Sequence, residues 1–213
     1  MSNFVNTIDL LGDDVVARQL VDGSITEFKD DVITNVKYFP FALQPNLTVV
    51  DMPNLIGDLV NINSAFRACS KLSTVNFPLL TAVGQYTFEK CVSLKKVVLP
   101  MVEIIGYGGF EGCSFLHTVD LHVVNRVSYK SFDNCTSLKC LILRSRIIAT
   151  ADVASFVTNT PIESGTGYIY VPRALVDSYK VATNWSVYAN QFRALEDYTV
   201  DGTITGELDE SKI

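Results

Sequence analysis

Apolar residues recur along this chain at a spacing of 22 residues, and four separate columns keep the same phase. The columns are Phe66, Phe88, Phe110 and Phe132; Cys69, Cys91, Cys113 and Cys135; Leu72, Leu94, Leu116 and Leu138; and Val75, Val97, Val119 and Leu141. A fifth column holds Pro78 and Pro100, with His122 in the place of the next proline. A unit this short cannot bury its own apolar face, so successive units must stack and bury a continuous one. The pattern therefore predicts a solenoid.

One more copy of the unit precedes these four, at a spacing of 25 residues. It matches the columns at Phe41, Gln44, Leu47, Val50, Met52 and Pro53, with Gln44 in the cysteine column. Another apolar column lies five residues before most of the phenylalanines, at Val36, Val83, Ile105 and Val127. We therefore expect five stacked coils.

The alternation of residues inside one unit predicts its local structure. Ser73 to Phe77 suit a short strand, with Val75 and Phe77 pointing inward and Thr74 and Asn76 outward. The Phe and Cys of each unit are three residues apart and would share one face of a helical turn. The predicted fold class is a solenoid with one β-strand and one short helical turn in each coil.

The ends of such a stack need covering, and the flanking segments suit that role. Residues 9–22 predict an amphipathic helix with Leu11, Val15 and Leu20 toward the first coil. Tyr168 to Val171 suit a strand, and Pro172 suits the start of a helix. Asp201-Gly202 predicts a hairpin. We thus expect an N-terminal helical cap or attachment segment at 1–31, the five-coil solenoid at 32–148, a C-terminal α/β cap at 149–197 and a hairpin tail at 198–213.

The charge and the start of the chain exclude several classes of partner. With 17 Lys and Arg against 23 Asp and Glu, the net charge is −6, which disfavours nucleic acid and anionic lipid as partners. No apolar run is long enough to insert into a membrane. The N-terminal residues do not have the pattern of a signal peptide. We expect synthesis in a bacterial cytoplasm, as a chain complete at both ends.

Neither the cysteines nor the histidines predict a reactive site. The five cysteines include no C-x-x-C pair, so we expect reduced, buried thiols rather than a metal site. Cys140 alone falls on an outward strand position and would be the most reactive thiol. His117 and His122 are expected to face solvent, and no catalytic motif accompanies them. The sequence thus predicts no catalytic residue, no metal and no cofactor.

Two sets of outward positions form a candidate interaction surface. The first is a column three residues before each phenylalanine, formed by Tyr38, Asn63, Gln85, Tyr107 and Tyr129. Such a row of aromatic and amide groups would suit flat sugar rings or a protein partner, although the tyrosines could simply cover the ladder beneath them. The second set varies from coil to coil on the outward strand face and comprises Thr74, Asn76, Lys96, Thr118 and Asp120.

The repeating unit, F-x-x-C-x-x-L-x-x-V-x-h-P with h apolar, resembles the BspA-like leucine-rich repeats. The segments SAFRACSKLSTVNFP and YTFEKCVSLKKVVLP carry the resemblance, which covers about residues 33–197 and departs from the pattern at Gln44 and His122. It implies a leucine-rich-repeat solenoid with a role in adhesion or protein interaction, and it implies no catalytic residue.

The short form of the chain, without a leader, resembles proteins of gut phages and prophages. We therefore expect a phage virion component, such as a fibre, tail or capsid-decorating protein. It would form a homo-oligomer, contact other virion proteins, and attach to a protein or surface glycan of a host cell. The alternative is a bacterial surface adhesion or protein-interaction module exported by a non-standard route.

Overall fold

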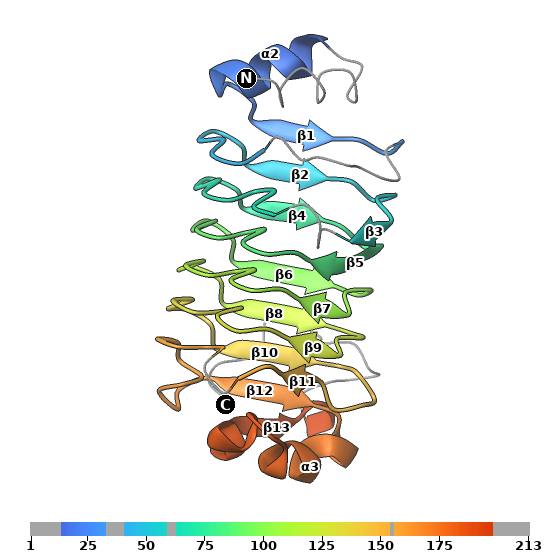
Figure 1. The fold of residues 1–213 in the computed structure, drawn as a ribbon, viewed down its shortest axis with the longest axis vertical. Helices are drawn as coiled ribbons and strands as arrows, with labels where there is room; N and C mark the ends of the chain where they lie inside the picture. Colours follow the sequence, from blue (N-terminus) through green and yellow to red (C-terminus); the bar gives the residue numbers. More distant parts are fainter. Residues whose placement is uncertain (1–13, 33–40, 59–62, 154–155, 198–213) are drawn as a thin grey trace.

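The protein is a parallel β-solenoid whose coils stack along one axis (Figure 1). The computed structural model describes residues 14–32, 41–58, 63–153 and 156–197. Predictions for Leu11, Val36, Tyr38 and the 198–213 tail lie outside these residues. No helix among the described residues has the length and apolar character needed to cross a bilayer.

The first sheet contains the strands that the valine column predicts, and it has further strands at both ends. Its strands are β1 (Glu27–Lys29), β2 (Val49–Asp51), β4 (Thr74–Asn76), β6 (Lys96–Leu99), β8 (Thr118–Leu121), β10 (Cys140–Leu143), β12 (Tyr168–Val171) and β13 (Phe192–Ala194). They pair in parallel in two runs, β1-β2-β4 and β6-β8-β10-β12-β13. The register aligns Val97 with Val119 and Val119 with Leu141, so the column predicted from the sequence is a column in space. All three side chains are buried.

A second sheet, to which the sequence pattern assigned no element, runs along another side of each coil. Its strands are β3 (Gly57–Asp58), β5 (Leu80–Val83), β7 (Ile104–Ile105), β9 (Arg126–Val127) and β11 (Thr150–Ala151), stacked in the order β11-β9-β7-β5-β3. The apolar column five residues before the phenylalanines supplies its buried side chains, Val83, Ile105 and Val127. Most of these strands have only two residues, too few for an alternating pattern to appear.

The third side of each coil consists of turns, and the short helical turn predicted there is a single tight turn that does not continue as a helix. It is closed by one hydrogen bond over three residues, such as the bond from Cys69 N to Phe66 O at 3.1 Å. The residue two positions after the ladder phenylalanine has a positive φ, for example 57° at Ala68 and 58° at Lys90. This left-handed residue ends any helix after one turn and directs its N–H toward the next coil. Ala68 N donates to the carbonyl of Glu89, and Lys90 N donates to that of Glu111. Beyond the single turn, hydrogen bonds between coils therefore take the place of further bonds along a helix.

Ladders of identical side chains fill the interior. The rings of Phe66, Phe88, Phe110 and Phe132 stack at centroid distances of 5.3, 5.1 and 5.6 Å, almost parallel. Each ladder cysteine donates its thiol to the phenylalanine carbonyl of the preceding coil, as Cys113 Sγ does to Phe88 O at 3.0 Å. Gln44 has no earlier phenylalanine carbonyl available among the described residues, and its Nε2 reaches the Leu20 carbonyl of the N-terminal helix at 3.0 Å. This contact explains the departure from cysteine.

Short elements lie at both ends of the stack. Helix α2 (Asp14–Asp22) precedes β1 and buries Leu20. After β12 come the 3-10 helix η1 (Arg173–Leu175), helix α3 (Val176–Val181), the 3-10 helix η2 (Ser186–Gln191), strand β13 and the 3-10 helix η3 (Leu195–Asp197). The strand and the proline-led start of η1 match the expected positions. The division of the chain into four segments stays a prediction.

The C-terminal segment supplies hydrogen bonds to the last strand of the second sheet. Tyr179 Oη accepts from Ala149 N at 2.8 Å, and Trp185 Nε1 donates to Ala149 O at 2.6 Å. Asn184 Nδ2 donates to Ala151 O at 2.8 Å. Side chains of this segment therefore stand where the backbone of a further coil would otherwise pair.

Candidate functional site

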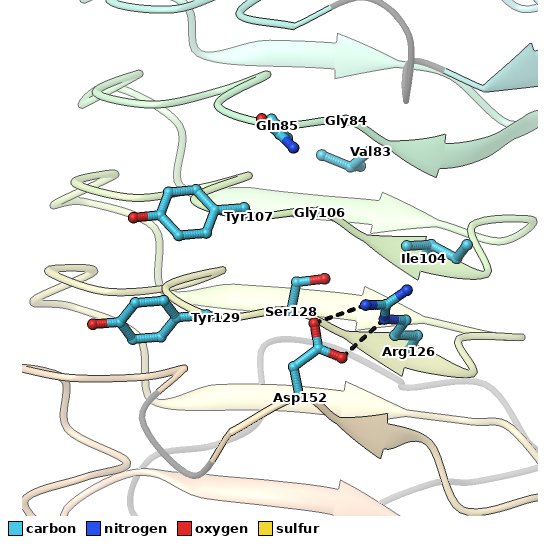
Figure 2. A pocket seen from close by; sticks show the side chains of 10 residues that line it. All are labelled: Val83, Gly84, Gln85, Ile104, Gly106, Tyr107, Arg126, Ser128, Tyr129 and Asp152. Atoms are coloured by element: carbon cyan, nitrogen blue, oxygen red, sulfur yellow. Dashed lines mark hydrogen bonds and ion pairs between the residues drawn. The ribbon is translucent and has the colours of Figure 1, made fainter.

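A groove of about 290 Å³ lies along the solenoid axis, between the second sheet and the turns that follow it. Its lining residues come from consecutive coils: Val83, Gly84, Gln85, Ile104, Gly106, Tyr107, Arg126, Ser128, Tyr129 and Asp152. Figure 2 shows the tyrosines on one side, Ile104 and Arg126 on the other, and Ser128 between them. We call this feature the tyrosine groove. Its volume is at the lower end for small-molecule sites.

The floor of the tyrosine groove is a column of small residues four positions before the ladder phenylalanines. Gly84, Gly106 and Ser128 occupy it, at the spacing of the coils. A Cβ on Gly106 would lie 2.9 Å from the Val83 carbonyl oxygen, closer than such contacts allow. Gly106 N donates to Val83 O and Ser128 N donates to Ile105 O, each bond reaching the preceding coil. The backbone of the preceding coil therefore leaves no room for a side chain at Gly106. The amides of Gly106 and Ser128 already donate hydrogen bonds to that coil.

One wall of the groove is formed by the rings of Tyr107 and Tyr129, and Tyr86 extends this ladder outside the groove. Tyr86 and Tyr107 meet edge to face at 5.1 Å between centroids, and Tyr107 and Tyr129 do so at 5.6 Å. A hydrogen bond with Tyr107 raises the pKa of the Tyr86 hydroxyl to about 12. Gly108, at φ 59°, leaves the space for this ladder, since a Cβ there would lie 2.7 Å from the Tyr86 ring. The Lys130 ammonium lies 5.6 Å from the centre of the Tyr129 ring.

The opposite wall carries one ion pair. Arg126 Nε and Nη2 donate to the two carboxylate oxygens of Asp152 at 2.9 and 3.0 Å. This bond lowers the pKa of Asp152, and a further hydrogen bond from Ser128 acts in the same direction. The same pair raises the pKa of Arg126. Both groups are therefore charged at neutral pH, and together they add no net charge to the groove.

Comparison with known families identifies the architecture. A sequence profile described as the BspA type leucine-rich repeat region matches residues 27–164, in six copies. The chain belongs to the BspA-type leucine-rich repeat family. Proteins of this family typically have binding or adhesion-type roles and are typically non-enzymatic, which agrees with the resemblance seen in the repeat unit.

Comparison with solved structures finds leucine-rich repeat proteins that are similar to this chain. A protein from Eubacterium ventriosum is 19% identical with a TM-score of 0.50, over 64% of this chain and 43% of its own. A leucine-rich cell surface protein from Faecalibacterium prausnitzii is 18% identical with a TM-score of 0.43, over 78% of this chain and 35% of its own. A protein from Bacteroides ovatus is 18% identical with a TM-score of 0.43, over 68% of this chain and 47% of its own. The chain thus spans less than half the length of these proteins. No match is found among curated proteins.

In this leucine-rich repeat chain, only part of the column predicted three residues before the phenylalanines lines the tyrosine groove. Gln85, Tyr107 and Tyr129 line the tyrosine groove, whereas Asn63 is exposed one coil earlier and outside it. Sequence reasoning missed Tyr86, because that ring comes from one residue later than the column. It also missed the Arg126–Asp152 pair, because Asp152 belongs to a coil beyond the five that were counted. The repeat phase identifies Asp152 only once Phe156 is recognised as a further ladder position.

The second predicted set lies on the outward face of the first sheet, away from the groove. Thr74, Asn76 and Lys96 are exposed there, and Thr118 is half-buried. Asp120 is different: it is buried and accepts hydrogen bonds from Arg144 Nε and Nη2 at 2.8 and 3.0 Å. Asp120 is therefore not an exposed recognition residue, because Arg144, which directly follows β10, pairs with it from the neighbouring coil.

Two further expectations concern reactive side chains. Cys140 does fall on the outward face of β10, but Ile142, Tyr170 and Leu195 cluster with it and leave it 1% exposed, so the prediction of an accessible thiol is wrong. His122 is half-buried, and its Nε2 lies 3.5 Å from Asp120 Oδ1. Among the described residues, no three His, Cys, Asp or Glu side chains gather as a metal site would require.

Proposed function

We propose that this leucine-rich repeat chain is a non-enzymatic binding protein of the adhesion type, and that its ligand is a neutral oligosaccharide held in the tyrosine groove. The observation that carries the proposal is the groove itself. An aromatic wall formed by Tyr107 and Tyr129 faces the Arg126–Asp152 pair across a floor of small residues. Sites of this kind combine apolar surface with a few well-placed polar groups.

The hydrogen-bonding state of the floor favours a sugar over an extended peptide. A peptide that adds to a sheet needs unpaired backbone groups along an edge. Here the amides of Gly106 and Ser128 already donate to the neighbouring coil. Recognition must therefore use side chains. A sugar ring offers an apolar C–H face for a tyrosine and a rim of hydroxyl groups for amides and charged groups.

The ion pair supports a ligand without charge. Arg126 uses two of its N–H groups on Asp152, and a guanidinium has five to give. The pair can thus donate to one sugar hydroxyl and accept from another, while its own charges cancel. A phosphate or carboxylate ligand would have to compete with Asp152 for Arg126. Gln85 and Ser128 add neutral donors and acceptors beside the pair.

An array of immobilised neutral and acidic oligosaccharides tests the proposal. We expect retention on neutral oligosaccharides, and about fivefold weaker binding for Tyr107→Ala, since one aromatic contact contributes about 1 kcal/mol. Phe115→Ala is the matched control, because Phe115 is 61% exposed and lies outside the groove. Binding only to acidic sugars, or only to proteins and without sensitivity to Tyr107→Ala, would contradict the proposal.

A separate part of the proposal concerns where this binding protein is carried, on a virion or on a bacterial surface. The resemblance of the chain to phage and gut bacterial proteins supports a virion first and a bacterial surface second. Mass spectrometry of purified phage particles and of washed cells separates the two. Recovery from particles supports a virion component, and recovery only from cell surfaces supports an adhesion module.

A further inference from the structure

Five exposed apolar side chains form a line on the outside of the solenoid, at the bend that leads into each strand of the second sheet. We call this line the apolar ridge. Its members, with their exposed fractions, are Ile56 (56%), Leu79 (38%), Met101 (46%), Val123 (40%) and Ile147 (62%). None of them lines the tyrosine groove.

The register of the second sheet aligns these residues. Gly57 pairs with Leu80, so the residues just before them, Ile56 and Leu79, are neighbours. Ala82 pairs with Ile104, Ile104 with Arg126, and Arg126 with Thr150. Three positions before Ala82, Ile104, Arg126 and Thr150 lie Leu79, Met101, Val123 and Ile147, in that order. The register therefore places the five residues at equivalent positions in consecutive coils, with a shift of the pairing at Gly57 and Asp58 beside Ile56.

The ridge is unusual for a surface exposed to water. Single exposed apolar residues are common, but a continuous apolar line indicates an interaction site. Five positions separated by about 4.8 Å give a line of about 19 Å. Pro78 and Pro100 directly precede Leu79 and Met101, and the restricted backbone at these bends holds the side chains in place.

Opposite charges stand at the two ends of the ridge. Arg146 is exposed and directly precedes Ile147. At the other end Asp31 is exposed, and its backbone carbonyl accepts a hydrogen bond at 2.7 Å from Asn54, two residues before Ile56. No member of the ridge between them is charged. The feature is thus a neutral apolar line with a positive end and a negative end.

We propose that the apolar ridge joins two copies of this chain in an antiparallel pair. A two-fold axis through Met101 places that residue against its own copy, Leu79 against Val123, and Ile56 against Ile147. Such an isologous contact uses the same patch on both subunits. The same axis brings Arg146 of one copy toward Asp31 of the other, whereas a parallel arrangement would bring like charges together. The ridge supplies the apolar core of the contact, and the polar residues beside it supply the rim.

The pairing has a consequence for binding. Ile104 and Arg126 of the groove follow Met101 and Val123 by three residues, so the groove and the ridge are adjacent along the same strands. An antiparallel pair would carry two tyrosine grooves running in opposite directions. Two linked sites bind a repetitive surface far more tightly than one. The pairing itself does not depend on what the groove binds.

Sedimentation velocity over a range of concentrations tests the pairing. We expect the wild-type chain to convert from monomer to dimer as the concentration rises. Met101→Glu and Met101→Lys should each stay monomeric, because like charges meet on the two-fold axis, and an equimolar mixture of the two should regain the dimer. Phe115→Glu, which changes an exposed residue away from the ridge, should behave as wild type. A wild-type chain that stays monomeric, or a mixture that does not pair, would overturn the proposal.

Cross-linking tests the orientation of the pair. The five native cysteines are at most 1% exposed, so an engineered thiol is the accessible one. With a short bismaleimide, Met101→Cys should give a covalent dimer, and Val181→Cys, at an 81% exposed position of α3, should not. Leu79→Cys should couple efficiently only when mixed with Val123→Cys. Efficient coupling of Leu79→Cys to itself would refute the antiparallel arrangement.

Discussion

Two aromatic ladders run along this solenoid with almost the same spacing, and they are built differently. Inside, neighbouring rings of the Phe66 to Phe132 ladder are inclined by only 7, 11 and 8° and are fully buried. Outside, Tyr86 and Tyr107 are inclined by 78°, and Tyr107 and Tyr129 by 70°. The coil spacing is common to both ladders, so it is the surroundings that set the ring geometry.

The contrast shows which part of a repeat is constrained. Neighbours on every side hold the interior rings parallel, although edge-to-face contacts suit the ring quadrupoles well. The outer rings have a solvent side and adopt the edge-to-face arrangement. The outer ladder also tolerates irregularity: Tyr86 joins it from one residue beyond the repeat column, at a φ of 54°. Interior positions therefore preserve the repeat, and exterior ones can diverge toward binding.

The most severe test of this contrast removes one ring from each ladder. Phe88→Ala leaves a cavity in the stack, and we expect the free energy of unfolding to fall by about 3–5 kcal/mol. Tyr107→Ala is the matched control and should cost about 1 kcal/mol or less, because its ring is partly solvated. Urea unfolding followed by circular dichroism measures both. Equal losses in the two variants would mean that the ladders do not differ as described.

The interior was predictable from the sequence because burial imposes one residue type on each column. The register of Val97, Val119 and Leu141 follows from phase alone. The second sheet was not predictable, since a two-residue strand such as Ile104–Ile105 shows no alternation. Nor were the turns, because Ala68 and Lys90 adopt a positive φ without the glycine that usually signals one.

The candidate site was predictable only where it follows the repeat. Tyr107 and Tyr129 lie in the expected column, so their shared wall could be inferred. Arg126 and Asp152 pair across 26 residues of sequence, and a 22-residue period does not bring them into the same column. Asp120 shows the converse: the phase placed it outward correctly, but the side chain of Arg144, which directly follows β10, pairs with it there. Residues outside the repeat columns make these charged contacts, so the repeat spacing does not predict them.

A second prediction concerns the thiols beside the interior rings. Burial raises the pKa of Cys69 from 9.0 to about 11. Because the neutral thiol is favoured in the folded chain, its contribution to stability is complete below pH 9 and is lost as the pH rises toward 11. Two pKa units correspond to about 2–3 kcal/mol. Wild-type stability should therefore fall more steeply than that of Cys69→Ala between these pH values, as measured by urea unfolding at each pH. Identical slopes would show that Cys69 is hydrated.

The smallest expected effect lies in the outer ladder. The hydrogen bond to Tyr107 raises the pKa of Tyr86 to about 12, so Tyr107→Phe should bring the pKa of Tyr86 back toward 10. NMR titration of ring-labelled tyrosine measures this change, and Tyr129→Phe, one coil further, should leave Tyr86 as it is. Stability should hardly change, because Tyr86 lies at the surface. If Tyr86 in the wild-type chain titrates near 10, the hydroxyl contact does not persist in water. The ring of Tyr107, which lines the tyrosine groove, would then have one contact fewer to hold it in place.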